Sequence, residues 1–315
     1  MRYGIPYQGS KNALAAEVVS LLPSAPRFVD LFAGGCALAH AAALCGRYKE
    51  VVANDLSHAG ISVFWEGLCG DYAGESRWIS REDFQILKDC DPFVSLVWSF
   101  GNNRRQYLYG ADIEPYKRAL HFAYFKGDYA PAHDLYGLDL SPLQYVPEDS
   151  RAKAMWKICE DAFRNGRLPR LGKRIQMCYL QHLGRIRDIQ SLANSADAIK
   201  ARLDIRCGDY RNVELRDGDC IVCDIPYGKT CGYGDGGFDR DGFCKWASEL
   251  DMPVFVFEYE MPRGFSPIWG KGRWDTFGRN GKKSMRGERL WVQSRYAYKY
   301  TFDFFMCEKG REYEP

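Results

Sequence analysis

The spacing of hydrophobic positions changes twice along the chain, and these changes predict its architecture. In residues 12–70, short apolar runs alternate with alanine-rich segments, as in the strand–helix repeats of a parallel sheet. In residues 71–170 the chain is instead aromatic, polar and rich in turn residues, which favours helices joined by loops. Strand-like runs return at 203–206, 219–223 and 253–257. The pattern therefore predicts an α/β sheet domain interrupted by a mainly helical insert.

One predicted strand ends in a glycine turn. The apolar run that starts at Phe28 contains Asp30 and Phe32, reaches Gly34 and Gly35, and leads into an alanine-rich helix. About twenty residues later a second strand ends in Asp55. Glycines let the backbone approach a ligand closely, and an acid at the next strand end suits ribose hydroxyls. Because the glycine spacing differs from G-x-G-x-x-G, the motif favours a nucleoside without a pyrophosphate, such as S-adenosylmethionine.

A second motif follows the apolar run 220–223 and reads Asp224-Ile225-Pro226-Tyr227. The acid and a backbone carbonyl next to the proline can accept hydrogen bonds from the amino group of a flat base. The ring of Tyr227 can stack on that base. An ordinary turn after a strand is the alternative, since Asp and Pro mark turns in general.

Taken in order, these motifs resemble the D12 class of DNA N6-adenine methyltransferases, the Dam-like group, and in particular its compact phage-type members. Tyr7-Gln8-Gly9-Ser10-Lys11 resembles the N-terminal cofactor segment of that family, and Cys207-Gly208-Asp209-Tyr210 the segment along the cofactor's adenine. One departure is that the family usually has proline where this chain has Ile225.

The resemblance implies an α/β, Rossmann-like, S-adenosylmethionine-dependent methyltransferase sheet with an inserted, mainly helical target-recognition region. The expected catalytic domain is 1–70 with 171–315, and the expected insert is 71–170. The implied reaction moves a methyl group from S-adenosylmethionine to N6 of an adenine flipped out of DNA, with Asp224, Ile225, Pro226 and Tyr227 as the catalytic residues. The implied cofactor residues are Tyr7, Lys11, Asp30, Phe32, Gly34, Asp55, Asp209, Tyr210 and Asp224.

The net charge is only +2, but basic residues gather locally. Residues 164–187 carry seven Arg and Lys and no acid, and 271–295 is also strongly basic. A third cluster, Phe100 to Tyr107, combines amide, guanidinium and aromatic groups that can read base edges. Each is either a DNA contact or an ordinary solvated surface. The candidate DNA-binding residues are Asn102, Arg104, Arg105, Arg170, Lys173, Arg174, Lys282 and Lys283.

Composition and cysteine spacing narrow the class of protein further. The 46% hydrophobic content is that of a folded globular protein. Twelve cysteines without the spacing of a disulfide scaffold favour reduced thiols in a cytoplasm, which the resemblance implies is that of a bacterial or phage-infected cell. Cys220 and Cys223 lie three apart on a predicted strand and so point to opposite faces; we expect no metal. The N-terminal residues do not resemble a signal peptide and no stretch resembles a membrane span. We expect duplex DNA as the partner.

Two rival functions stay open on the sequence alone. N4-cytosine methyltransferases use a related tetrapeptide, although serine usually stands where this chain has Asp224. The other rival is an inactive methyltransferase fold that binds DNA or cofactor without turnover, which only Ile225 favours. C5-cytosine methylation needs a cysteine after a proline, and this chain has no Pro-Cys pair. The recognition sequence, the methylation state of the target, a partner nuclease and the oligomeric state have no signature here.

Overall fold

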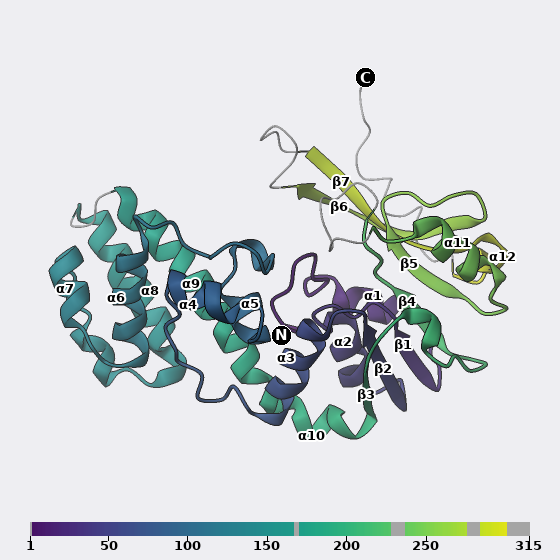
Figure 1. Ribbon diagram of the computed structural model, residues 1–315, viewed down its shortest axis with the longest axis horizontal. Coiled ribbons are helices and arrows are strands. Elements are labelled where there is room, and N and C mark those ends of the chain that lie inside the picture. Colours follow the sequence, from purple (N-terminus) through teal and green to yellow (C-terminus); the bar gives the residue numbers. More distant parts are fainter. Residues whose placement is uncertain (1, 167–169, 228–236, 276–283, 301–315) are drawn as a thin grey trace. The chain divides into compact units, whose positions relative to one another are not determined.

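The chain is described by a computed structural model that covers residues 2–166, 170–227, 237–275 and 284–300. It divides into two compact units. The sheet unit comprises Leu14–Ile61 and Ala201–Pro315, and the helical unit comprises Met1–Ala13 and Ser62–Lys200. Each unit is described by itself below, and both are drawn in Figure 1.

The sheet unit contains a seven-stranded sheet in the order β3-β2-β1-β4-β5-β7-β6. Five strands run parallel to one another, and β7 and β6 are antiparallel to their neighbours. This mostly parallel sheet confirms the predicted α/β, Rossmann-like fold class. The strands are β1 (Arg27–Asp30), β2 (Glu50–Asp55), β3 (Leu203–Cys207), β4 (Cys220–Cys223), β5 (Val254–Glu258), β6 (Phe265–Asp275) and β7 (Ser284–Gln293).

Both faces of the sheet are covered, because alternate strand residues point to opposite sides. Val29, Ile221 and Val254 pack with Phe243 and Ala247 of helix α11 (Arg240–Glu249) on one face. Helix α2 (Ala37–Cys45) contacts β1 and β2, and helix α1 (Ala15–Leu21) packs on α2. The short helices η5 (Tyr210–Asn212) and α12 (Ser294–Ala297) complete the unit.

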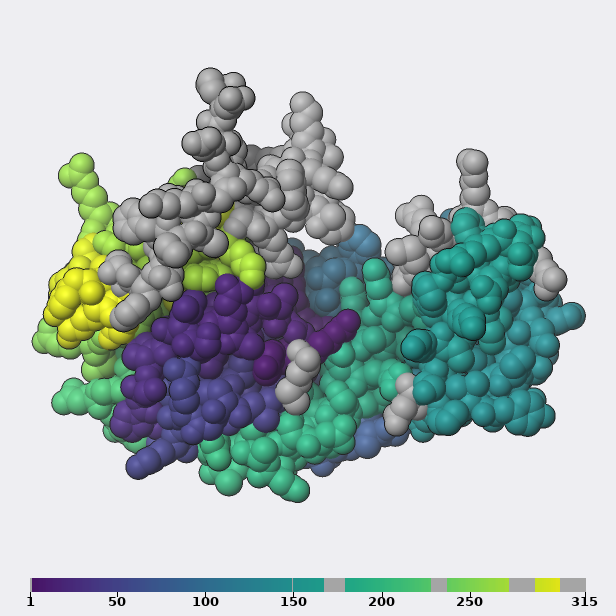
Figure 2. Space-filling view, turned by 180° about the vertical axis from the view of Figure 1, so that it is seen from behind, coloured from purple at the N-terminus to yellow at the C-terminus, as the bar shows by residue number. Residues whose placement is uncertain are grey.

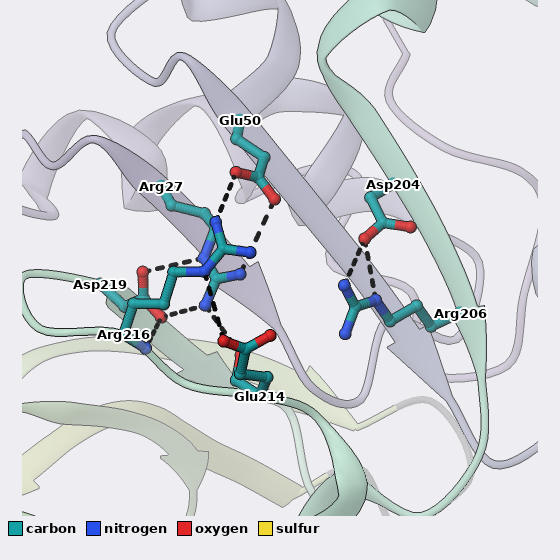
Figure 3. Close-up of polar contacts among 7 residues, drawn as sticks. All are labelled: Arg27, Glu50, Asp204, Arg206, Glu214, Arg216 and Asp219. Carbon is teal, nitrogen blue, oxygen red and sulfur yellow. Dashed lines mark hydrogen bonds and ion pairs between the residues drawn. The ribbon is translucent and has the colours of Figure 1, made fainter.

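The edge of the sheet at which the parallel strands begin is held by buried charges (Figure 3). Arg27 opens β1, and Asp219 precedes β4. The Arg27 Nε lies 2.9 Å from Asp219 Oδ1 and its Nη2 2.6 Å from Oδ2, with both side chains about 3% exposed. Arg216 joins this group through Glu50 at 3.1 Å. The two hydrogen bonds from the Arg27 guanidinium to Asp219 therefore link β1 to β4 at the edge opposite their carboxyl ends.

The helical unit, Met1–Ala13 with Ser62–Lys200, is wider than the predicted insert 71–170, whose role as a separate target-recognition region stays a prediction. Its core includes Leu120, Leu140, Met155, Tyr179 and Leu183, and the residues of α6, α7 and α8 form one continuous body in the space-filling view (teal, Figure 2). Its elements are α4 (Arg81–Leu87), α5 (Pro92–Val97), η1 (Phe100–Asn102), α6 (Glu114–Phe125), α7 (Ala130–Tyr136), η2 (Ser141–Tyr145), α8 (Glu148–Arg164), α9 (Arg170–Gln190), η3 (Ser191–Ser195) and α10 (Ala196–Ile199); α3 (His58–Cys69) and η4 (Lys200–Arg202) cross the boundary between the units.

Local sequence explains where several of these helices begin. The Ser80 side chain accepts a hydrogen bond from Asp83 N while the Asp83 carboxylate accepts one from Ser80 N, which forms a capping box before α4. Asp91 caps α5, and Pro92 occupies its first position, where the missing N–H costs nothing.

The β6–β7 hairpin was not predicted from the sequence. Its strands contain Pro267, Gly270, Gly272 and Gly287, and such residues are depleted in strands. A register shift between Pro267 and Trp269 also interrupts the alternation along β6. The hairpin is instead specified by pairing between β6 and β7 and between β7 and β5, which a local pattern does not reveal.

Candidate active site

Three acids gather at the carboxyl edge of the sheet. Asp30 ends β1, Asp55 ends β2 and Asp224 directly follows β4. Because β2 and β4 flank β1 on opposite sides, the strand order reverses at β1, and ligands of open α/β sheets bind at such a switch point. Burial raises the pKa of Asp30 well above its usual value, and the negative charges of Asp224 and Asp55 add to that shift.

Asp30 lies deepest of the three, with a side chain that is only 1% exposed. The backbone N–H groups of Phe32 and Ala39 donate to its carboxyl group, but its Oδ1 has no hydrogen-bond partner among the described residues. A buried carboxyl oxygen normally has a partner. This orphaned atom therefore marks a place where a bound group would complete the site.

Asp55 holds the glycine turn in place. Its Oδ2 accepts a hydrogen bond from Gly34 N at 2.8 Å, and its Oδ1 accepts one from Ser57 N at 2.8 Å. Gly34 has a φ of 51°, which glycine adopts without strain. These two bonds fix the Asp55 carboxylate beside the glycine turn.

Asn54, which the sequence analysis did not single out, braces the same turn. Its buried Nδ2 donates to Leu31 O at 3.2 Å and to Gly208 O at 3.0 Å, and its backbone carbonyl accepts from Ala33 N at 2.8 Å. It thereby joins the loops that follow β1 and β3. The available signal was an amide directly before the strand-end acid, but its partners are distant in sequence.

Five aromatic side chains pack beside the acids. Tyr210 lies 5.1 Å from Phe32, 5.6 Å from Phe243 and 4.9 Å from Trp246, measured between ring centroids. Phe238 lies 5.6 Å from Phe32. Phe32 and Tyr210 were predicted as cofactor residues, whereas Phe243 and Trp246 were not, because their contribution depends on how α11 folds back on the sheet.

Asp209 has a strong local partner. Its Oδ1 accepts hydrogen bonds from Arg211 N and Nε, both at 2.9 Å, and this pairing lowers the pKa of Asp209 to about 2. The carboxylate therefore stays ionised at neutral pH. Its expected contact with a cofactor adenine stays a prediction, and Arg211 is an addition that the sequence analysis did not make.

Within the tetrapeptide 224–227, Ile225 packs in the core, whereas Tyr227 is held by a hydrogen bond and a ring contact. Ile225 is buried in the core beside α11, with 2% of its surface exposed. The hydroxyl of Tyr227 donates to Glu288 Oε1 at 2.7 Å, and its ring meets Tyr259 at 4.7 Å and 64°. Burial, followed by the charges of Asp224 and Glu288, raises the pKa of Tyr227 well above its usual value. Tyr227 is thus a neutral phenol at physiological pH.

Tyr7 and Lys11 belong to the helical unit. Ser10 N donates to Tyr7 O at 3.2 Å in a tight turn, and the buried Lys11 donates through Nζ to Gly9 O at 3.3 Å. A cavity of about 310 Å³ in this unit is lined by Tyr7 and Ser10 together with Asn102, Gln181 and Arg185. That Tyr7 and Lys11 share one cofactor site with the acids of the sheet unit stays a prediction.

The predicted base-reading cluster forms a tight loop closed by a bridge between Ser99 and Tyr107. Asn102 and Arg104 have φ values of 58° and 62°, uncommon for residues other than glycine. Asn102 Nδ2 donates to Leu96 O at 2.8 Å, while Arg104 and Arg105 are exposed. Asn102 therefore anchors the loop, and the two arginines are presented outward.

The other predicted DNA contacts remain predictions. Arg170, Lys173 and Arg174 lie on α9, and nothing is described of their side chains; Lys282 and Lys283 lie outside the described residues. Elsewhere in these stretches, Lys271 pairs with Glu17 at 2.6 Å and Arg164 with Glu160 at 2.7 Å.

The described residues contain neither a candidate metal site nor a membrane-spanning helix. No three His, Cys, Asp or Glu side chains there are grouped so that they could hold a metal ion. Cys223 belongs to the core beside α11, whereas Cys220 interacts with Tyr48. Among the described helices, none has the length and apolar character needed to cross a membrane.

Comparison with known proteins agrees with this geometry. Residues 7–124 match the family model of the D12 class N6 adenine-specific DNA methyltransferases. The chain is also 22% identical to the retron Ec67 DNA adenine methylase of Escherichia coli over 258 residues, which cover 78% of this chain and 71% of that protein. Residues 7–124 are thus similar to the D12 class N6 adenine-specific DNA methyltransferases, and the longer, weaker similarity is to a DNA adenine methylase.

Proposed function

We propose that the protein uses S-adenosylmethionine to methylate N6 of an adenine that it flips out of duplex DNA. The observation that carries the proposal is the convergence of Asp30, Asp55 and Asp224 on the carboxyl ends of β1, β2 and β4. The D12 family generally uses this methyl donor, which supports the same choice here.

The residues of the sheet unit fit S-adenosylmethionine. Asp55 is an acid at the end of β2 that suits ribose hydroxyls, and Phe32 and Tyr210 offer apolar ring surface for an adenine. Asp30 adds a buried carboxyl group whose Oδ1 has no hydrogen-bond partner within the described chain. A cluster of carboxyl groups attracts a cation, and the sulfonium centre of S-adenosylmethionine supplies a positively charged, electrophilic methyl group when it is bound.

Asp224 and the carbonyl of Ile225 would act on the target amine. An adenine within a duplex is out of reach, so the base must first leave the stack. Its amino nitrogen is a poor nucleophile because the lone pair is delocalised into the ring. Two acceptors that bind the amino hydrogens favour a tetrahedral nitrogen and stabilise the positive charge that develops on it. S-adenosylmethionine would supply the methyl group that the amino nitrogen takes up, and Asp224 would accept the amino proton that is released.

The departure at Ile225 leaves the proposed chemistry possible. The isoleucine side chain packs in the core beside α11. The group that the mechanism needs at this position is the backbone carbonyl, which isoleucine supplies as proline does.

The loop closed by Ser99 and Tyr107 is our candidate for base readout. Arg104 and Arg105 are exposed on it, and Phe100 is 51% exposed. Guanidinium groups can bind guanine edges or phosphates, and an exposed aromatic ring can occupy the gap left by a displaced base. These features support DNA contact from the helical unit.

The product of the reaction tests the proposal directly. Purified protein is incubated with unmethylated duplex DNA and methyl-labelled S-adenosylmethionine, and the digested nucleosides are identified by mass spectrometry. We expect labelled N6-methyladenine. Labelled N4-methylcytosine would replace the proposal by the cytosine activity, and cofactor binding without any labelled base would support the inactive fold.

A further inference from the structure

A buried carboxylate lies behind the aromatic residue of the catalytic motif. Glu288 is on β7 and is 6% exposed. Its Oε1 accepts the hydroxyl proton of Tyr227 in a 2.7 Å hydrogen bond. Tyr227 is 61 residues earlier in the chain, in the turn after β4, so this contact joins the predicted catalytic motif to the antiparallel extension of the sheet.

A third side chain belongs to the same group. β5 and β7 pair as far as Glu258 opposite Arg289, and Tyr259 is the residue directly after β5. The ring of Tyr259 meets that of Tyr227 at 4.7 Å and 64°. Tyr227 is therefore held at its hydroxyl by Glu288 and along its ring by Tyr259.

This arrangement determines what Tyr227 can do. Its hydroxyl proton is committed to Glu288, and the nearby charges of Asp224 and Glu288 keep the phenol neutral. A hydrogen bond from a phenol to a carboxylate is stronger than one between neutral groups. It limits rotation of the ring, so that the ring can be presented to a base in one orientation.

We propose that Glu288 is a positioning residue for methyl transfer, which acts by fixing the ring of Tyr227 against the flipped base. The inference rests on the proposed function, because it takes Tyr227 as the stacking residue. A buried carboxylate is a costly way to fill space. The Glu288 carboxylate has a specific use if it accepts the hydrogen bond that holds the Tyr227 hydroxyl in place.

The test is a double-mutant cycle on Tyr227 and Glu288. The variants Tyr227→Phe, Glu288→Leu and their double variant remove the donor, the acceptor and both, while Glu288→Gln keeps an acceptor oxygen without the charge. Single-turnover methylation rates, the Kd for S-adenosylmethionine and thermal unfolding are measured for each. A matched control is Tyr72→Phe, because the hydroxyl of Tyr72 donates to Glu66 in the helical unit with the same chemistry.

We expect Tyr227→Phe and Glu288→Leu each to slow methyl transfer by about 10- to 100-fold, as a misplaced reactant does, with little change in the cofactor Kd. The double variant should be no slower than the slower single variant, and Glu288→Gln should keep most of the rate. Tyr72→Phe should keep the wild-type rate. If Glu288→Leu does not fold, the cycle is run with Glu288→Gln, which should slow the wild type only slightly, and its double variant with Tyr227→Phe should be as slow as Tyr227→Phe alone.

Three results would overturn the inference. Additive losses would show that the two residues act separately. A Glu288→Gln variant as slow as Glu288→Leu would show that the charge matters and not the hydrogen bond. If the methylation rate falls only in proportion to thermal stability, for Tyr72→Phe as for Tyr227→Phe, then Tyr227 and Glu288 serve folding and not methyl transfer. Failure of the proposed function is distinguishable, because the wild type would then form no N6-methyladenine at all.

Discussion

At the residue scale, the carboxylate of Asp55 has two tasks that compete for its oxygens. It holds Gly34 N and Ser57 N, each at 2.8 Å, and we propose that it also accepts from a ribose hydroxyl. The motif revealed the acid, since Asp55 ends an apolar strand in the expected place. Its bond to Gly34 spans 21 residues and could be recognised only once the turn was folded.

Substitution of Asp55 tests its contact with the cofactor. Asp55→Ala should weaken S-adenosylmethionine binding by about tenfold or more, since it removes a charged hydrogen-bond partner and loosens the glycine turn. Isothermal titration calorimetry measures the change. Asp217→Ala serves as the control, because Asp217 is an exposed acid of the same unit. An Asp55→Ala variant with wild-type affinity would remove Asp55 from the cofactor site.

At the scale of elements, the helices of the insert share a buried basic and aromatic cluster. His121 of α6 and His182 of α9 both pack against Trp98, at 5.9 and 4.4 Å between ring centroids, and Lys117 of α6 is fully buried nearby over the ring of Tyr109. Burial lowers the pKa of His121 to about 4 and that of His182 well below its usual value. The charge of Lys126 lowers the pKa of His121 further. The charges of Arg185 and Lys117 do the same to the pKa of His182.

This cluster predicts a loss of stability in mild acid. Below pH 6.5 the unfolded chain protonates His121, whereas the folded chain does not until about pH 4. The unfolded state thus binds more protons in this window, and the free energy of unfolding falls as pH falls, by about 2 kcal/mol for His121 alone between pH 7.5 and pH 5. Chemical unfolding followed by tryptophan fluorescence at pH 7.5 and pH 5 measures the change.

The matched variant is His121→Asn, which removes the titrating ring. It should flatten the pH dependence by up to about 1.4 kcal/mol per pH unit in the window between pH 4 and 6.5. Equal pH dependence in His121→Asn and the wild type would show that His121 does not titrate with unfolding.

At the scale of the whole molecule, we propose that the sheet unit carries out the methyl transfer and that the helical unit contacts DNA. The sequence predicted β1 to β5 and the insert because each is specified by a local pattern of apolar runs, turns and strand-end acids. It did not predict the β6–β7 hairpin, the aromatic neighbours on α11 or Glu288. These depend on contacts such as that of Glu288 with Tyr227, and no local pattern encodes a partner 61 residues away.

DNA recognition is the prediction at this scale. Arg105→Ala should weaken DNA binding, because Arg105 is exposed on the Ser99–Tyr107 loop. If Arg105 contacts a phosphate, the slope of log affinity against log salt should fall by about one unit. If it contacts a base, the loss should be confined to DNA with the correct base at one position. Arg118→Ala on α6 is the exposed control, and equal affinities for both variants and the wild type would exclude Arg105 from the interface.

The most direct test of the account is the rate of methyl transfer without the carboxylate of Asp224. In single-turnover reactions with saturating DNA and S-adenosylmethionine, Asp224→Ala should lower the rate by at least about 10²- to 10³-fold, as expected for loss of one preorganised group at the transition state. Its thermal unfolding should stay close to that of the wild type, and the exposed-site variant Asp251→Ala should keep the full rate. An Asp224→Ala enzyme that forms N6-methyladenine at the wild-type rate would contradict the account.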